Sequence, residues 1–327
     1  MTSLRALRRR LHAARLAPDG ARRPDAPFGR GPLAARVLAH VIDAAAWAGG
    51  RVPAGVAHRL ADVGGTGEWA ARRGKRRSLA VNLAHAVGLP PEHPDVAALV
   101  RREVVNEAHR SADLLWALGR RDEFLRTTEL EGVEHAQRAA AAGRGVILAG
   151  IHIGGWEVAT AVPRAVLPVP TTVIVADNWL AWAIEHMRVT AGLRVMYRTE
   201  PAIRAARLLR DGEALLVLGD DGWGPDPRGI AVGFLDGRAV LPAGIVALAR
   251  LTGAPIVSFY VLPVGRRRWR VVVDPPVEAP ARREGEEGER RALQLLADRW
   301  SEVIRAHPEH WAANYRIGWV DDEGLQA

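Results

Sequence analysis

The sequence of 327 residues contains no cysteine. The chain therefore forms no disulfide, has no thiolate nucleophile and offers no cysteine ligand to a zinc ion. Because no thiol is present, the sequence does not reveal the redox state of its compartment. The length fits one large domain or two small ones, and an apolar content of 48% is enough for a proper core.

Serine is also scarce, and the common cofactor fingerprints are missing. None of the five serines lies in a G-x-S-x-G turn, which argues against an ordinary serine hydrolase. Gly64, Gly65 and Gly67 form a cluster, but neither the preceding strand nor the spacing of a dinucleotide site is there, and a Walker A loop is absent. His307 and His310 are spaced like metal ligands without a third ligand nearby. We therefore expect no bound cofactor and no metal.

Lys75 is the only lysine, so arginine carries nearly all the positive charge behind the net charge of +8. The excess is uneven, since residues 1–30 contain eight arginines against Asp19 and Asp25. Such an arm suits an anionic membrane surface or nucleic acid, and a solvated, partly disordered tail is the alternative. We expect a membrane surface as the partner and no nucleic acid.

Long hydrophobic runs are absent as well. No uninterrupted apolar segment approaches the roughly 18 residues that a spanning helix needs, and none follows the early arginines as in a secretory signal. Leu33–Trp47 is the most apolar stretch near the start, but Arg36, His40 and Asp43 interrupt it. The pattern is typical of an amphipathic or packed helix and favours a peripheral membrane protein.

Hydrophobic periodicity divides the chain into two parts. Helices are expected at 3–16, 32–48, 53–73, 75–87, 94–118 and 121–126 in the first part. In the second, strands are expected at 145–151, 171–176, 193–197, 214–219, 230–234, 255–262 and 268–274, with helices at 131–142, 155–166, 179–191, 201–211, 242–252 and 284–307. This alternation predicts an α/β fold with a mainly parallel central sheet flanked by helices. The domains we expect are a basic arm (1–30), a helical region (31–126), an α/β core (127–320) and a tail (321–327).

The stretch around His152 is the most informative part of the sequence. Val146–Ile151 is an apolar run long enough for one buried strand, and His152 follows its carboxyl end, where open α/β sheets bind ligands. Two glycines and the expected helix come next, which puts Glu157 on the first helical turn. A histidine beside a carboxylate is suited to general-base catalysis on a hydroxyl. A histidine held by local hydrogen bonds alone is the other interpretation.

Further segments follow in a fixed order. They are Arg188 at the end of an expected helix, Asp220 and Asp221 after a strand, Phe234 and Leu235, Pro242 and Gly244 leading into a helix, Thr252–Pro255, and the closing Pro308 and Trp311, with Arg77 and Asn82 upstream. In this order and spacing the chain resembles the bacterial lysophospholipid acyltransferase superfamily. The branch it is most similar to contains the lipid A late acyltransferases and the phosphatidylinositol mannoside acyltransferases. The resemblance covers roughly residues 75–319.

This resemblance implies a glycerolipid acyltransferase-like fold and an acyl-transfer reaction. The enzyme would move a fatty acyl chain from acyl-CoA or an acyl-carrier protein, as co-substrate, to a hydroxyl of a lipid or glycolipid acceptor. His152 would deprotonate that hydroxyl, and Glu157 would orient the imidazole and balance its charge. The implied location is the cytoplasmic face of the inner (plasma) membrane, at its surface.

Other residues are expected to hold the reacting groups. Backbone N–H groups at Gly154 and Gly155 are candidate donors to the tetrahedral oxyanion, with Arg188 as another. Asp220 and Asp221 are expected to position the donor or the acceptor. The alternatives are structural: a helix cap for the arginine and a turn cap for the two aspartates.

Three arginines, Arg238, Arg266 and Arg268, are candidates for binding thioester phosphates or lipid head groups. For residues 266–268 the alternative is an exposed hairpin turn. The sequence also departs from the family pattern, because Asp236 stands where the family has glycine and the segment 222–227 is longer than the usual loop.

Three other functions stay open on the sequence. The first is acylation of a soluble or natural-product acceptor. The second is a basic membrane- or nucleic-acid-binding module without catalysis, and the third is a thioesterase-like hydrolase.

Overall fold

The computed structural model describes residues 33–178, 181–182, 184–220 and 229–320. Its amino-terminal helices are α2 (Leu33–Gly49), α3 (Ala54–Ala71), α4 (Arg73–Val87), α5 (Pro94–Gly119) and α6 (Arg121–Thr127). Each agrees with the helix predicted from periodicity to within two residues at either end. The helix expected at 3–16, the basic arm and the tail lie outside the described residues, and the proposed domain boundaries stay a prediction.

The rest of the described chain alternates between strands and helices. The strands are β1 (Glu129–Glu131), β2 (Val146–Gly150), β3 (Thr171–Val175), β4 (Arg194–Tyr197), β5 (Ala214–Leu218), β6 (Gly229–Phe234), β7 (Gly237–Pro242), β8 (Ile256–Gly265), β9 (Arg268–Val273) and β10 (Gly318–Trp319). The helices are α7 (Val133–Ala141), α8 (Val162–Val166), α10 (Glu185–Thr190), α11 (Ala202–Arg210), α12 (Gly244–Thr252) and α13 (Gly285–Ala306), with short 3₁₀ segments η1 (Val158–Ala161), η2 (Arg282–Glu284) and η3 (Pro308–His310).

Seven of these strands form one central sheet in the order β1-β9-β8-β2-β5-β3-β4. Every neighbouring pair in it is parallel except β8 with β9. Strands β6, β7 and β10 form a smaller antiparallel sheet beside it. The predicted α/β fold with a mainly parallel sheet is confirmed.

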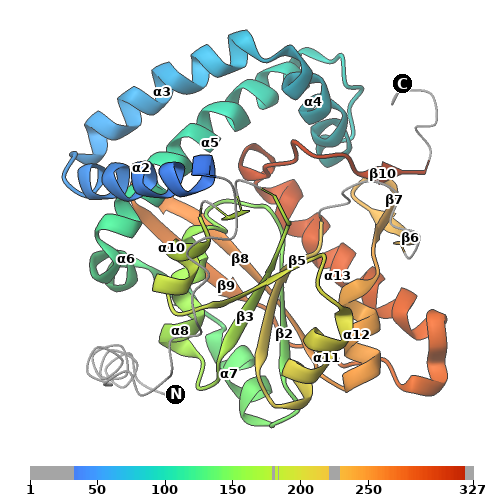
Figure 1. The fold of residues 1–327 in the computed structure, drawn as a ribbon. Coiled ribbons are helices and arrows are strands. Elements are labelled where there is room, and N and C mark those ends of the chain that lie inside the picture. The colour runs from blue at the N-terminus through green and yellow to red at the C-terminus, as the bar shows by residue number, and fades with distance from the viewer. Residues whose placement is uncertain (1–32, 179–180, 183, 221–228, 321–327) are drawn as a thin grey trace.

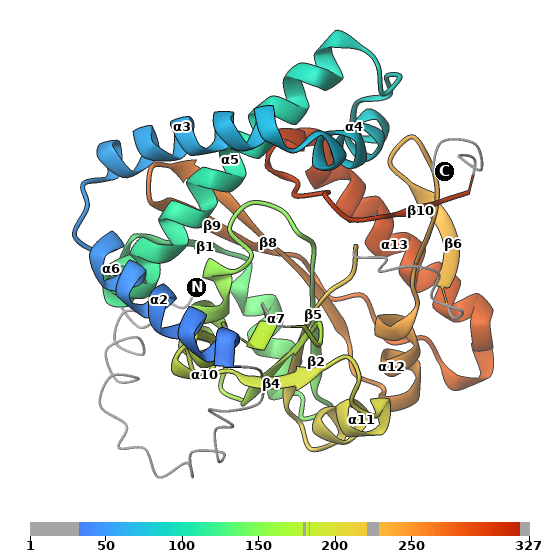
Figure 2. The same cartoon turned by 45° about the horizontal axis from the view of Figure 1, so that its top comes forward.

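Helices cover both faces of the central sheet (Figure 1). Side chains of α7 and α8 pack with one face, and side chains of α11, α12 and α13 pack with the other. The amino-terminal helices lie across the edge where β2 and β5 end, with α3 and α5 side by side (Figure 2). Leu79 of α4 and Val96 of α5 belong to the same buried cluster as Ile151 after β2, so the helical region shares the core of the sheet.

Two predicted elements differ in the structure. The helix expected from 155 is a turn through Trp156 and Glu157, and helical structure begins only at Val158 in a 3₁₀ turn. Pro242, which was expected to open a helix, closes β7 instead. Among the helices that the structure describes, none has the length and apolarity needed to cross a bilayer.

Candidate active site

The register of two neighbouring strands places His152 next to Asp220. Strands β2 and β5 are parallel, and Gly150 is paired with Leu218. His152 and Asp220 each lie two residues beyond these paired positions, so they leave the sheet side by side. The Nδ1 atom of His152 lies 2.9 Å from Oδ1 of Asp220, and the backbone N–H of His152 donates to the same carboxylate at 3.0 and 3.2 Å.

The Asp220 carboxylate is fully buried inside a cluster of hydrogen-bond donors. Besides His152, it accepts from the indole Nε1 of Trp311 at 3.0 Å and from the hydroxyl of Tyr315. Burial alone would raise the pKa of Asp220, but the charge of His152 and the donated hydrogen bonds together hold it below its usual value. Asp220 is therefore an anion at neutral pH.

The imidazole of His152 is fixed at one nitrogen and enclosed by two aromatic rings. Its side chain is 19% exposed. The ring of Trp156 meets it edge-on at 5.3 Å, and the ring of Tyr315 lies 5.0 Å away. When Nδ1–H is donated to Asp220, Nε2 is the basic nitrogen of the neutral ring. This tautomer is the one that a general base needs.

The two glycines after His152 let the loop lie against β8. Gly154 has a φ of +55°, and a Cβ atom there would come within 1.8 Å of the carbonyl oxygen of Val261. The N–H of Gly155 donates to that same oxygen at 2.8 Å, and the N–H of Gly154 donates to the carbonyl of His310 at 2.9 Å. Both N–H groups are thus engaged within the protein, which removes the reason to assign them to an oxyanion.

Glu157 forms an ion pair with Arg188. The Nη2 atom of Arg188 lies 3.0 and 3.3 Å from the two carboxylate oxygens, and Arg188 is only 8% exposed. Its Nε and Nη1 atoms are buried without a hydrogen-bond partner among the described residues. The structure thus places Asp220 at Nδ1 of His152 and pairs Glu157 with Arg188 at the end of α10. The role expected of Glu157 toward the imidazole stays a prediction.

A cavity of about 190 Å³ opens beside Glu157. It lies between α2, α5, α6, η1 and α10. Its wall is mostly apolar and also contains Asp43 and Arg121; the apolar residues are Ala46, Leu114, Ala117, Leu118, Phe124, Val158, Ala161, Met187 and Ala191. A cavity with such a lining is suited to an aliphatic group.

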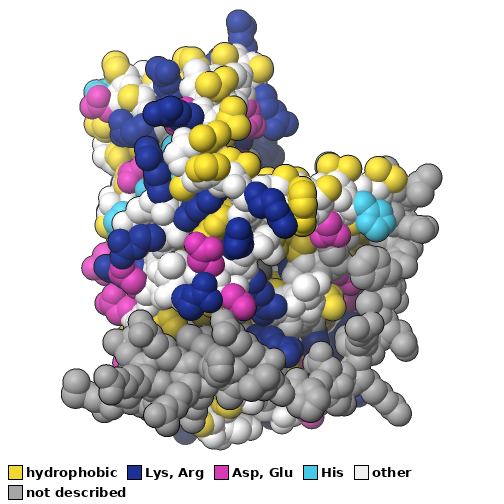
Figure 3. All heavy atoms as spheres, turned by 90° about the vertical axis from the view of Figure 1, so that its left-hand side faces the viewer, with side chains coloured by type: hydrophobic (Ala, Val, Ile, Leu, Met, Phe, Trp, Pro, Cys, Tyr) yellow, Lys and Arg dark blue, Asp and Glu magenta, His cyan; other side chains and the backbone are white. Residues whose placement is uncertain are grey.

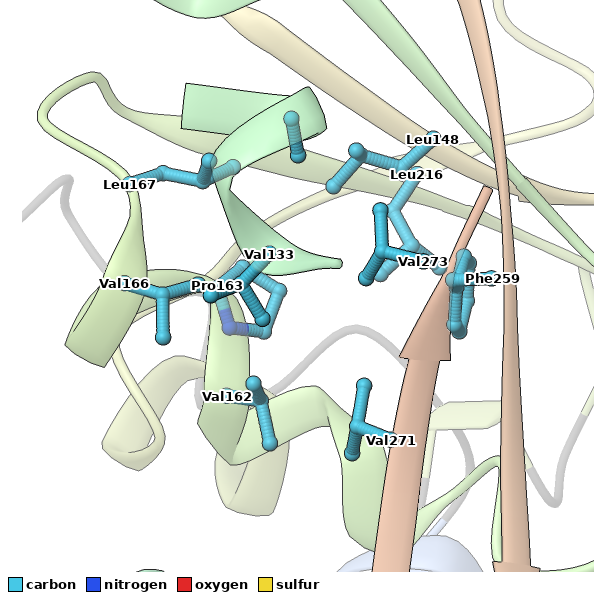
Figure 4. A pocket seen from close by; sticks show the side chains of 11 residues that line it. Val133, Leu148, Val162, Pro163, Val166, Leu167, Leu216, Phe259, Val271 and Val273 are labelled. Atoms are coloured by element: carbon cyan, nitrogen blue, oxygen red, sulfur yellow. The ribbon is translucent and has the colours of Figure 1, made fainter. Parts of the chain in front are cut away.

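A second cavity lies under α7 and α8, against the sheet (Figure 4). Its volume is about 40 Å³, and its wall is wholly apolar, from Val133 on α7 to Phe259 on β8. An apolar cavity of about 150 Å³ can hold a benzene ring. The space beside Glu157 exceeds that size, and the space under α7 does not.

The three arginines proposed for phosphates or head groups lie on two different sheets. Arg238 is an exposed residue of β7, whereas Arg266 lies in the turn between β8 and β9 and Arg268 is the first residue of β9. Arg268 forms an exposed ion pair with Glu129 at 3.0 Å. The hairpin-turn interpretation of residues 266–268 therefore describes their position, and their role in binding stays a prediction.

The two departures from the family pattern lie away from these contacts or outside the described residues. Asp221 and the segment 222–227 lie outside the described residues. Asp236 occupies the β6–β7 turn and lies 2.6 Å from Nδ1 of His85, whose ring stacks on Trp319 at 3.6 Å. Asp236 thus ties this turn to α4. Within the described ranges, no group of three His, Cys, Asp or Glu side chains is arranged to hold a metal ion.

Comparison with known proteins shows which family the chain belongs to. Residues 35–313 match the family model described as bacterial lipid A biosynthesis acyltransferase. The chain belongs to that family. It is therefore an enzyme that transfers acyl groups.

Curated relatives agree with the family assignment. A phosphatidylinositol mannoside acyltransferase of Mycobacterium tuberculosis is 26% identical over 256 residues, covering 74% of this chain and 76% of that protein. One from Mycolicibacterium smegmatis is 28% identical over 265 residues, covering 76% and 81%. The crystal structure of the 1-acyl-sn-glycerophosphate (LPA) acyltransferase, PlsC, from Thermotoga maritima matches with a TM-score of 0.34 and 15% identity over 63% of this chain and 82% of that chain, which is too loose to bear on the site.

Sequence reasoning on this acyltransferase missed two groups at the site. Tyr315 carries no motif, and only the fold brings it to Asp220. Arg110 and Glu103 lie inside a long predicted helix, where charged residues are expected to face solvent. Both are buried, and their seven-residue spacing on a helix was the available signal.

Proposed function

We propose that this acyltransferase moves an acyl chain from a thioester to a hydroxyl of a lipid or glycolipid, with His152 as general base. The observation that carries the proposal is the hydrogen bond between His152 and the buried Asp220 carboxylate. The family membership and the names of the relatives support the acceptor class. A mannosylated phosphatidylinositol is accordingly the first acceptor to test.

The proposed reaction has two steps. Nε2 of His152 takes the proton of the acceptor hydroxyl as its oxygen bonds to the thioester carbonyl carbon. The tetrahedral intermediate then expels the thiolate, which takes the proton back from the imidazolium. Asp220 holds the ring and stabilises its positive charge without accepting the proton itself. The products are an ester and a free thiol.

Glu157 and Arg188 take related roles in this proposal. Since the N–H groups of Gly154 and Gly155 are engaged, Arg188 is the remaining candidate for oxyanion stabilisation, and its Nε and Nη1 atoms have no partner in the described part of the chain. Glu157 holds the guanidinium in place through its ion pair.

The cavity beside Glu157 is proposed to hold the acyl chain. Replacing Ala117 with leucine would fill part of it, so kcat/KM for palmitoyl-CoA should fall about tenfold relative to octanoyl-CoA, because methylenes that no longer fit lose binding energy. Ala136→Leu, in the smaller cavity, is the matched control and should lower stability without changing the chain preference. A changed preference in Ala136→Leu alone would place the chain under α7 instead.

A membrane surface is proposed to contact α2 and α3. Val37, Val41 and Trp47 on α2 and Leu60 and Val63 on α3 are all more than half exposed. On the side of the molecule where these helices meet, apolar side chains are interspersed with Lys and Arg (Figure 3). This combination suits an anionic lipid surface.

The double variant Leu60→Glu, Val63→Glu should bind anionic vesicles at least tenfold more weakly, because two aliphatic side chains that leave water for the lipid contribute about 3 kcal/mol or more. Co-sedimentation with vesicles measures the affinity. The control is Ile203→Glu on α11, also exposed at 60%. Equal binding by all three proteins would exclude α3 from the contact.

The direct test follows thiol release from palmitoyl-CoA with and without a lipid extract. Release that depends on the lipid, with an acylated lipid detected by mass, supports the proposal. Transfer to soluble sugars in place of lipids would indicate a soluble acceptor. Thiol release of equal rate without any acceptor would indicate a hydrolase.

A further inference from the structure

Helix α5 carries a buried ion pair on the face that it turns toward the site. Glu103 is fully buried and Arg110 is 7% exposed, and Nη2 of Arg110 donates to Oε1 of Glu103 at 2.8 Å. Seven residues are two helical turns, so both side chains leave the same face of α5. Two charges removed from water lose much hydration, and a pair of this kind adds little stability over apolar packing. Its presence on a core helix needs another explanation.

This pair leaves several polar atoms unpartnered. The Nε and Nη1 atoms of Arg110 and the Oε2 atom of Glu103 are buried with no hydrogen-bond partner among the described residues. Nearly all buried donors in folded proteins have an acceptor. Two nitrogens of the Arg110 guanidinium thus have no acceptor within the described residues, and both can donate to oxygen atoms of a bound group.

Arg110 is linked to the histidine of the proposed mechanism through the ring of Trp156. Its Cζ atom is 5.3 Å from the ring of Trp156, and that ring is 5.3 Å from the ring of His152. Trp156 and His152 are both partly exposed. A group bound to Arg110 would thus lie near the indole of Trp156, which separates it from His152 by one ring.

We propose that Arg110 binds a phosphate group of a substrate of this site, an inference that rests on the proposed function. Phosphate oxygens are the acceptors that a planar guanidinium binds most strongly. Both substrates of the proposed reaction can carry this group, since CoA and the carrier-protein arm contain phosphate and so do phospholipid acceptors. The shared chemistry is a phosphate ester, and its source is left to the experiment.

Glu103 is compatible with an anion at this place. Burial raises its pKa to about 7, although the charge of Arg110 acts in the opposite direction. The carboxylate can therefore take up a proton when a second anion approaches the guanidinium. The positive charge of Arg110 would then be offered to the phosphate.

Binding is tested with inorganic pyrophosphate by isothermal titration calorimetry at fixed salt, which requires no catalysis. Arg110→Met should weaken binding at least tenfold, because it keeps an unbranched apolar stem and removes the guanidinium donors. The matched control is Arg76→Met on α4, whose guanidinium also lies over a tryptophan, at 5.0 Å from the ring of Trp69. Equal affinity of the wild type and Arg110→Met would overturn the proposal.

A second variant protects this test against misfolding. Glu103→Gln keeps the hydrogen bond to Arg110 and removes the competing charge, so pyrophosphate should bind more tightly than in the wild type. A damaged fold cannot produce such a gain. Unchanged or weaker binding in Glu103→Gln, with the wild-type melting temperature retained, would contradict the proposal.

Kinetics then identify the source of the phosphate. If the donor supplies it, Arg110→Met should raise KM at least tenfold for palmitoyl-CoA and leave it unchanged for the palmitoyl thioester of N-acetylcysteamine, which has no phosphate. If the acceptor supplies it, the loss should appear with phosphatidylinositol and not with diacylglycerol. An equal loss with all four compounds would show a structural role and overturn the proposal. A wild type without transfer activity would refute the proposed function alone, because the titration still decides on Arg110.

Discussion

Replacing His152 with alanine should lower kcat by on the order of 10²- to 10⁴-fold, since a positioned general base contributes that much to proton transfer. His152 is bonded to Asp220, so its removal also leaves the carboxylate without one donor. The measurement is acceptor-dependent thiol release from palmitoyl-CoA under saturating substrate. Circular dichroism and the melting temperature report whether the fold is kept.

The control for His152→Ala is His135→Ala on α7, whose ring contacts Arg138 at 3.0 Å near the surface. This variant should keep the wild-type kcat. If His152→Ala retains wild-type turnover with an intact fold, His152 is not the base, and the site must be sought elsewhere.

Asp220→Asn changes few atoms, yet it should lower kcat by about 10³- to 10⁴-fold. An amide in place of the carboxylate that holds a catalytic imidazole favours the wrong tautomer and removes the charge that stabilises the imidazolium. The amide NH₂ would also face donors, because Asp220 accepts from His152, Trp311 and Tyr315. Tyr315→Phe removes one donor only and should have a much smaller effect on the same assay.

The Asp220 prediction has a second readout in the pH dependence of stability. The pKa of Asp220 is lowered in the folded protein, so its ionised form stabilises the fold at pH values above the usual aspartate pKa. That contribution is lost as the pH falls through the lower pKa of the folded state. Urea unfolding should therefore show a stability gap between wild type and Asp220→Asn that is constant near neutrality and shrinks toward strong acid. A gap that does not change over this range would mean that the buried charge is not its cause.

The individual elements of this fold could be predicted from sequence because their patterns are local. The apolar run before His152 forms β2, and the periodicity of residues 94–118 locates α5 to within one residue. Strand β7 was missed because it ends in Pro242, a residue more typical of a helix start or a loop. The turn at Trp156 and Glu157 was missed because the two glycines before it serve close approaches, of Gly154 to β8 and of Gly155 to the ring of Trp269 on β9.

The contacts of the site depend on the order of strands, which local patterns do not contain. Asp220 was expected at a strand end, but its contact with His152 exists only because β5 is the neighbour of β2. Glu157 is nearer to His152 in sequence, so the sequence pointed to Glu157 and not to the contact of the ring with Asp220. The partners of Arg110 could not be predicted either, since a helical pattern does not say which charged face is buried.

The pairing of β2 with β5 also bears on how the enzyme becomes active as it folds. The contact between His152 and Asp220 joins residues 68 positions apart, and the contact between Asp220 and Trp311 joins residues 91 positions apart. Contacts of such long range form slowly because the intervening chain must first lose its freedom. The imidazole is therefore held only after the middle of the sheet and the segment after α13 have come together, so a chain whose helices are already formed still lacks an ordered base.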